Sequence, residues 1–385
     1  MVNRKLSNRK STYPLLPYSQ LVFDATRWLP RVYSFPSVMR WREGAVHKDR
    51  IENALRTALA NHPVLASRVD WRGRQYMAEP KDILHGQYYD LDLEVKGEDL
   101  HLKLSGSRIL GDGKSGEILL DDIERAYKGL PLEPDDYWGY VAAFERRKTQ
   151  PHYNSSHAWL MNEFSDETVP VRPFMDRKCL WTPLPPKLGL YQADYTDLHA
   201  KINDLARTQH LSMDGFFSLC TALAIAEYNG TDEAALTWAY EGREAPEEQR
   251  IVGSLHRDIP FKINRKSIIS NQGSAIREAR NQIRSGIAHS DYPYTLTAPY
   301  NKRWNYAVNV LRIADPEDVL AQTSLPIEIV SVPPQKYAYA LLDVEIHERT
   351  DTLALWFRYS ATNYKESSIR RFAALIRQNA EWLLQ

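Results

Sequence analysis

Cysteine is scarce in this chain, since only Cys179 and Cys220 occur among 385 residues. Cys220 lies in the apolar run 216–226, where a small buried hydrophobic side chain is the usual role of a free cysteine. Two cysteines cannot build a disulfide framework or a cysteine-based zinc site. The eleven histidines are scattered and form neither a helical i, i+4 pair nor a cluster with cysteine. We therefore predict no metal site and no directly bound cofactor.

Long apolar runs and an excess of charge are also missing. No stretch approaches the roughly twenty apolar residues that cross a bilayer, and the basic segment 1–10 is not followed by the apolar core of a secretory signal. We therefore expect a cytoplasmic protein without membrane contact. The 49 basic and 49 acidic residues cancel, and neither sign forms a long run. We expect no nucleic-acid partner, because the field that would hold a phosphate backbone is lacking.

The periodicity of the remaining sequence predicts a mixed α/β protein. Hydrophobic residues make up 43% of the chain, enough for one large core or two medium ones. Apolar residues recur at helical spacing in several segments, namely 48–61, 118–127, 198–205, 276–287 and 369–384. Other segments are typical of strands, namely 64–69, 74–76, 100–104, 234–240, 306–312, 337–348 and 352–359.

The order of these elements is similar in the two halves of the chain, which predicts two lobes. The segment 164–187 holds five prolines and little periodicity, as expected of a connection between lobes. We place an N-terminal lobe at 1–170 and a C-terminal lobe at 171–385.

The segment 107–113, Ser-Arg-Ile-Leu-Gly-Asp-Gly, follows a predicted strand and precedes a predicted helix. Such a junction can present side chains and the first N–H groups of the helix to a ligand. A surface turn is the simplest interpretation. A phosphate-binding loop is the other, because Gly113-Lys114-Ser115 resembles the end of one, but the required glycine is replaced by Arg108.

Several segments, taken in order, resemble one known family. They are Tyr13–Gln20 (YPLLPYSQ), Ile51–Val69 (with ALRTALANHPVLASRV), Leu104–Tyr127, Tyr137–Glu145, and Glu241-Gly242-Arg243 with Val252-Gly253 and Asp258-Ile259-Pro260. The chain resembles the condensation domain of nonribosomal peptide synthetases, within the chloramphenicol-acetyltransferase-like acyltransferase superfamily. The resemblance implies two chloramphenicol-acetyltransferase-like lobes in a V. It also implies a central tunnel that admits the phosphopantetheine arm of a carrier protein, or of coenzyme A, as ligand.

The resemblance also assigns site residues. The family's His-His-x-x-x-Asp-Gly motif falls on Ser107 and Arg108 at the two histidine positions and on Asp112 and Gly113 at its end. It implies that Asp112 is structural and forms a buried ion pair with Arg243. Arg108 cannot remove a proton from an attacking amine, because a guanidinium offers donors only. It can stabilise an oxyanion, and we expect it to point into the tunnel, away from its strand neighbour Ile109.

We therefore expect a condensation-domain-like protein of peptide natural-product biosynthesis that has lost its catalytic histidines and binds or recruits partners. Arginine at the second histidine position resembles the X domains that recruit oxygenases to a carrier-bound peptide, although these usually carry an acidic residue where this chain has Gly113. The expected partners are a peptidyl or acyl carrier protein and a tailoring enzyme such as an oxygenase, bound by a monomer. The alternatives are an active acyltransferase that forms an amide or ester from an acyl thioester, and an inert remnant.

Overall fold

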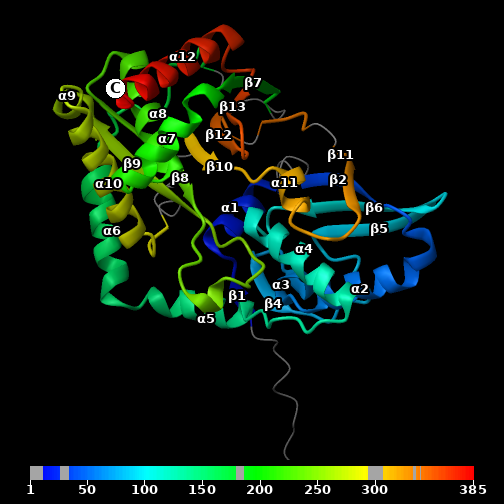
Figure 1. Cartoon of the computed structure of the whole chain (residues 1–385). Coiled ribbons are helices and arrows are strands. Elements are labelled where there is room, and N and C mark those ends of the chain that lie inside the picture. Colours follow the sequence, from blue (N-terminus) through cyan, green and yellow to red (C-terminus); the bar gives the residue numbers. More distant parts are fainter. Residues whose placement is uncertain (1–11, 27–33, 179–185, 294–306, 333–334, 339) are drawn as a thin grey trace, which may run out of the picture. The chain divides into compact units, whose positions relative to one another are not determined.

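The computed structural model describes residues 12–26, 34–178, 186–293, 307–332, 335–338 and 340–385. Helices and strands both occur throughout these residues (Figure 1). The content of 44% helix and 24% strand confirms the α/β class. The chain divides into two compact units: unit 1 comprises 1–146, 242–255 and 316–334, and unit 2 comprises 147–241, 256–315 and 335–385.

Unit 1 is built on a four-stranded antiparallel sheet in the order β11-β2-β6-β5. Its strands are β2 (Ser34–Trp41), β5 (Tyr89–Lys96), β6 (Asp99–Ser107) and β11 (Ile327–Ser331). Leu100 and Leu102 of β6 are buried, as the period-two alternation predicts. A second, three-stranded sheet has the order β1-β4-β3, with β1 (Thr12–Pro14), β3 (Ser67–Val69) and β4 (Arg74–Met77).

The helices of unit 1 bury their apolar stripes against the larger sheet. Ile51 and Leu55 of α2 and Ile118 of α4 share one core with Leu100 and Leu102. The helical elements are α1 (Pro17–Thr26), η1 (Ala45–His47), α2 (Lys48–Ala60), α3 (Pro63–Ala66), α4 (Gly113–Lys128), α5 (Tyr137–Arg147, which reaches the unit boundary), η2 (Pro246–Glu248) and α11 (Pro316–Leu320).

Unit 2 holds a six-stranded mixed sheet in the order β7-β13-β12-β10-β8-β9. β10 is parallel to both of its neighbours and the other pairs are antiparallel. The strands are β7 (Leu188–Asp194), β8 (Glu233–Tyr240), β9 (Arg257–Asn264), β10 (Asn309–Arg312), β12 (Leu342–Glu348) and β13 (Leu353–Ser360). The helices are α6 (Pro151–Phe164), α7 (Thr196–Gln209), α8 (Met213–Asn229), α9 (Arg265–Ile268), α10 (Gln272–Ala288) and α12 (Glu366–Leu383).

Helix α8 forms the centre of unit 2. Every residue from Met213 to Ala226 except Asp214 is buried, which agrees with the apolar character of this segment on all sides. Ser212 caps the helix, and its Oγ accepts a hydrogen bond from the Gly215 N–H at 3.1 Å.

The two units are not the contiguous lobes 1–170 and 171–385 predicted above. The contacts divide the chain after Arg146, and unit 1 takes up two later segments, 242–255 and 316–334. Residues 165–178 of the proline-containing segment lie inside unit 2. Prolines favour turns and loops, and these occur within a domain as well as between domains. The rest of that stretch, 179–185 with Cys179, lies outside the described residues.

One predicted strand is partly helical. Residues 63–66 form the short helix α3, and only Ser67–Val69 form a strand. The physical reason is Pro63, whose fixed φ suits the first position of a helix. The predicted strands 306–312 and 337–348 are observed over shorter ranges, as β10 and β12, whereas β13 matches 352–359 to within one residue. Position 306 lies outside the described residues. Across the part of the chain that is described, no helix is long and apolar enough to cross a membrane.

Candidate functional site

The segment 107–113 joins β6 to α4, as the strand-loop-helix spacing predicts. β6 ends at Ser107, whose N–H donates to the Tyr88 carbonyl oxygen at 2.9 Å and whose carbonyl oxygen accepts from the Leu110 N–H at 3.1 Å. The Ser107 Oγ accepts from the Ile109 N–H at 3.4 Å. The hydroxyl is therefore engaged by its own turn, as is common for serine at the end of a strand.

The turn at Arg108 and Ile109 is held by two serine hydroxyls. The Ser254 Oγ donates to the Arg108 carbonyl oxygen at 2.8 Å, and the Ser19 Oγ donates to the Ile109 carbonyl oxygen at 2.8 Å. The expectation that Arg108 and Ile109 alternate across a strand is wrong, because the strand has already ended at Ser107. Ile109 is buried and Arg108 is half-buried. The orientation of the Arg108 side chain toward a tunnel stays a prediction.

Asp112 begins helix α4 as its N-cap. Its Oδ1 accepts from the Ser115 N–H at 3.1 Å and from the Ser115 Oγ at 2.9 Å, which satisfies one of the unpaired N–H groups of the first turn. Gly111 allows this turn, because a Cβ there would lie 2.8 Å from the Ser115 side chain. Gly113 is not required sterically, since a Cβ at that position would meet nothing within 4 Å.

The structure brings Asp112 and Arg243 together in a bidentate ion pair. Arg243 Nη1 donates to Asp112 Oδ2 and Nη2 donates to Oδ1, each at 2.9 Å. The exposed fractions of the two side chains are 0% for Arg243 and 7% for Asp112. Arg243 Nη2 also donates to the carbonyl oxygens of Ile251 (3.0 Å) and Gly253 (3.2 Å). The pair therefore fastens the late segment 242–255 to the start of α4.

Ser115 also holds the segment 242–255 to the start of α4. Its buried Oγ accepts from the Gly253 N–H and lies 3.0 Å from the Gly253 carbonyl oxygen. Asp112 also accepts from the Leu255 N–H at 3.0 Å. The spacing Asp-x-x-Ser at a helix start is a capping pattern, so the local role of Ser115 was predictable. Its hydrogen bond to Gly253, which lies 138 positions away, was not predictable from the sequence.

A second buried charge cluster lies in unit 1 around His62. His62 is fully buried, with Nδ1 2.8 Å from Asp135 Oδ2 and Nε2 3.0 Å from Asp122 Oδ2. Burial opposes the charged imidazolium, but hydrogen bonds to the two carboxylates outweigh it and raise the pKa of His62. Arg250 pairs with Asp122 as well, and the Val252 N–H donates to Asp135 at 3.1 Å. This cluster, too, ties the segment 242–255 to unit 1.

Glu124 of α4 holds the other late segment, 316–334. It accepts from the Thr323 hydroxyl and, through its two oxygens, from the Ser324 N–H and hydroxyl at 3.2 and 2.7 Å. Burial alone would raise the pKa of Glu124, but hydrogen bonds from Lys128, Thr323 and Ser324 lower it to about 2. A carboxylate that is charged at all physiological pH values therefore anchors this segment.

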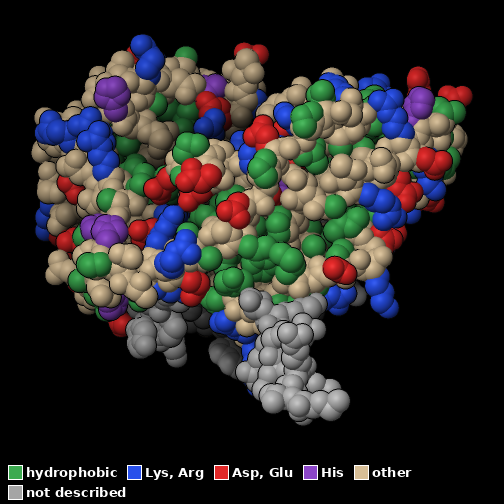
Figure 2. Space-filling model, turned by 90° about the horizontal axis from the view of Figure 1, so that it is seen from below, with side chains coloured by type: hydrophobic (Ala, Val, Ile, Leu, Met, Phe, Trp, Pro, Cys, Tyr) green, Lys and Arg blue, Asp and Glu red, His purple; other side chains and the backbone are tan. Residues whose placement is uncertain are grey.

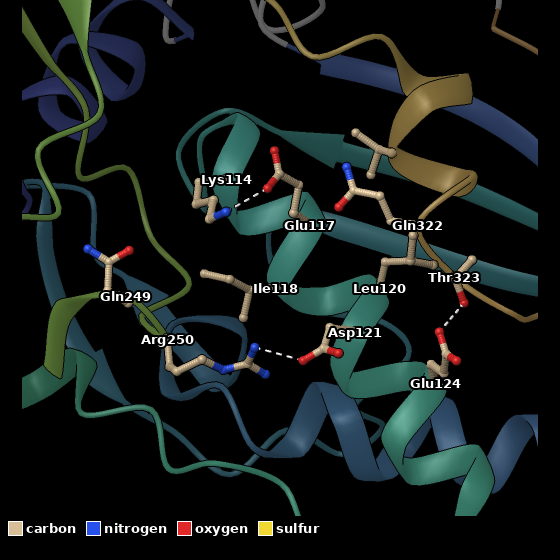
Figure 3. Close-up of a pocket in the computed structure, with 11 residues that line it drawn as sticks. Lys114, Glu117, Ile118, Leu120, Asp121, Glu124, Gln249, Arg250, Gln322 and Thr323 are labelled. Atoms are coloured by element: carbon tan, nitrogen blue, oxygen red, sulfur yellow. Dashed lines mark hydrogen bonds and ion pairs between the residues drawn. The ribbon is translucent and has the colours of Figure 1, made fainter. Parts of the chain in front are cut away.

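A cavity of about 330 Å³ lies between α4 and these two late segments (Figure 3). Four of its charged side chains are paired within the wall: Lys114 with Glu117 at 2.7 Å, and Arg250 with Asp121 at 2.7 Å. The charges of these four side chains therefore offset one another within the wall.

Metal-ligating groups are sparse. Within the described ranges one group could offer three ligand atoms within 4.8 Å of one another, namely His85, Asp90 and Asp92. All three are exposed, and His85 Nδ1 already bonds Asp90. Exposed groups of this kind do not amount to a built metal site.

Comparisons with known proteins identify the family. A model of the condensation domain family matches residues 93–385, which is more than half of the chain. The chain belongs to the condensation domain family. Among curated proteins, the nonribosomal peptide synthetase inpB of Emericella nidulans is 27% identical over 174 residues, which cover 42% of this chain and 7% of the synthetase. The chain spans about a tenth or less of the length of the curated relatives it matches.

Solved condensation-domain structures share the fold. The condensation domain of the Monacolin K polyketide synthase MokA has a TM-score of 0.75 at 15% identity, covering 97% of this chain and 98% of that domain. The X-domain from teicoplanin biosynthesis has a TM-score of 0.75 at 16% identity, covering 100% of this chain and 97% of that domain. That X-domain has also been solved in complex with OxyB. The resemblance predicted from the sequence is confirmed, and the likeness to these structures is one of fold.

Proposed function

We propose that this condensation-domain chain acts as a binding or recruiting module of nonribosomal peptide biosynthesis and does not carry out ordinary condensation. The observation that carries the proposal is the pair Ser107 and Arg108 at the positions of the two family histidines. Arg108 has no lone pair with which to accept a proton, and its guanidinium is charged at every accessible pH. Ser107 would need a neighbouring base to act as a nucleophile. Within the described residues, its hydroxyl is bonded only to the Ile109 N–H.

The intact framework around the motif supports a chain that folds without the two family histidines. Asp112, Arg243 and Ser115 form a buried network in which both carboxylate oxygens of Asp112 and both Nη atoms of Arg243 are hydrogen-bonded. Breaking such a pair typically costs about 3–5 kcal/mol. A chain that retains this network keeps the architecture of unit 1 in the absence of the histidines.

The proposed partners follow from the family. We infer that the chain binds a peptidyl or acyl carrier protein and that the phosphopantetheine arm, or coenzyme A, is its ligand. A tailoring enzyme is the second proposed partner. The basis is that a fold relative, the teicoplanin X-domain, forms a complex with OxyB.

The competing function is an active acyltransferase, and Arg108 is the residue that favours it, since a guanidinium can stabilise an oxyanion. The test incubates a loaded carrier protein and an acceptor amine with the wild type, Arg108→Ala and Arg108→His, while carrier binding is measured by calorimetry. The proposal expects binding by the wild type with product formation at the uncatalysed rate in all three proteins. Turnover by the wild type that falls about 10²- to 10³-fold in Arg108→Ala would establish the enzyme instead.

Ser107→Ala is the matched control for this experiment. A nucleophilic serine would lose all turnover on this substitution, whereas an oxyanion role of Arg108 would survive it. Absence of carrier binding by the wild type would refute the recruiting function itself.

A further inference from the structure

The small sheet β1-β4-β3 of unit 1 has one buried and one open face. Val69 and Gln75 turn inward, where Gln75 is 1% exposed and accepts a hydrogen bond from the Tyr137 hydroxyl at 2.7 Å. The opposite face carries Arg68 and Tyr76, which pair across the strands, and Arg74 at the next position of the same face. Figure 2 views the side of unit 1 on which α3 and β4 lie and shows hydrophobic side chains gathered there.

Trp71 stands at the tip of the β3–β4 hairpin with 74% of its surface exposed. The Arg72 guanidinium lies 4.7 Å from the centre of its ring. A tryptophan buries 150–250 Å² when it enters a partner, and tryptophan and arginine are the residues most enriched among those that dominate binding energy. An exposed tryptophan with an adjacent arginine is therefore the pair expected at the centre of an interface.

The hairpin tip is rigid, which lowers the entropic cost of binding. Asp70 Oδ1 accepts from the N–H groups of Arg72 and Arg74 at 2.8 and 2.9 Å, and the Asp70 carbonyl oxygen accepts from the Gly73 N–H at 3.0 Å. Gly73 supplies the φ of +76° that the turn needs. Asp70, the one acidic residue from 67 to 77, thus has its carboxylate engaged by the backbone.

We propose that the hairpin surface, defined by Arg68, Trp71, Arg72, Arg74 and Tyr76, is the docking site for an acidic carrier-protein domain. Three arginines around an aromatic centre fit a partner with an apolar patch and a rim of carboxylates. The strands of the surface contain three and four residues, about 13 Å at strand rise, which suits a small domain. The inference rests on the proposed function, because that function supplies the carrier protein.

The test titrates the carrier-protein domain encoded nearest to this chain, in its phosphopantetheine-bearing form, into the full chain by calorimetry at 50 and 300 mM salt. Trp71→Ala is expected to weaken binding about 30-fold or more, as loss of a dominant interface residue does. Arg68→Glu is expected to weaken it about tenfold and to flatten its salt dependence. Phe174→Ala in unit 2, where the side chain is 65% exposed, is the matched aromatic control and should bind like the wild type.

A spectroscopic measurement separates docking from a loss of folding. With 5-fluorotryptophan in place of the ten tryptophans, the Trp71 resonance is assigned by its absence in Trp71→Phe, and it should shift when the carrier protein is added. A wild type that binds the carrier while Trp71→Ala binds equally well would overturn the docking site and leave the proposed function standing. No binding by the wild type would overturn both. Binding of phosphatidylglycerol vesicles through Trp71, with carrier binding unaffected, would make the surface a membrane contact and refute the proposal.

Discussion

Replacing Asp112 by asparagine removes one charge from the buried ion pair while the side chain keeps its shape. The amide oxygen can still cap α4, because asparagine and aspartate are similar N-caps. Arg243, whose side chain is 0% exposed, is left without its counter-charge. Loss of one partner of a buried pair costs about 3–5 kcal/mol, so we expect a decrease of this size in the stability of unit 1.

Amide hydrogen exchange measures this loss of stability in the segment that the ion pair holds. The segment 242–255 is held to α4 by Asp112 and Ser115 through the N–H groups of Leu255 and Gly253. At 1.36 kcal/mol per decade, amides of this segment should exchange about 150- to 5000-fold faster in Asp112→Asn, as detected by mass spectrometry. Such a local readout is preferable to a single melting temperature, because a chain of two units need not unfold in one step.

Two further variants make the interpretation specific. Asp121→Asn removes an acid from the same helix whose side chain is 48% exposed, and a surface pair of this kind contributes at most about 1 kcal/mol. The double variant Asp112→Asn with Arg243→Met should recover part of the loss, because no unpaired charge remains. Exchange in Asp112→Asn that stays within threefold of the wild type would refute the reasoning.

Three other outcomes are expected. The pKa of His62 is raised in the folded state, so its contribution to the unfolding free energy is complete below pH 6.5 and is lost as pH rises through the folded pKa. Urea titrations should show this decline, with a limiting slope of about 1.4 kcal/mol per pH unit, and His62→Gln should lack it. The pKa of Glu124 is lowered to about 2, so its contribution to the unfolding free energy is complete above pH 4.5 and fades toward pH 2. At pH 7, Glu124→Gln should lower the unfolding free energy by about 1.5–3 kcal/mol in urea titrations. An unchanged urea midpoint would contradict the anchoring role of Glu124. Gly111→Ala should cost about 1–3 kcal/mol through crowding against Ser115, whereas Gly113→Ala should cost nothing, and equal melting temperatures for the two would disprove the packing argument.

Local elements were predictable because their signals are local. The alternation of Leu100, Leu102 and Leu104 predicted β6, and the helical spacing after Gly113 predicted α4. The start of α8 is equally local, because Ser212 caps that helix with its own side chain. At residues 63–66 two local signals compete. The apolar run predicts a strand, but Pro63 favours the first position of a helix, and a helical turn forms.

The sequence by itself determined the family and the α/β class, because these depend on residue type and order. Only the tertiary structure decided which distant groups meet. The pairing of Asp112 with Arg243 was predicted from the family resemblance. Sequence spacing could not predict it, since 131 positions separate the two residues. His62 follows helix α2 closely in the sequence, and only the folded chain shows that it is buried between Asp122 and Asp135. Such contacts are decided by how the late segments return to unit 1, and no periodicity along the chain carries that information.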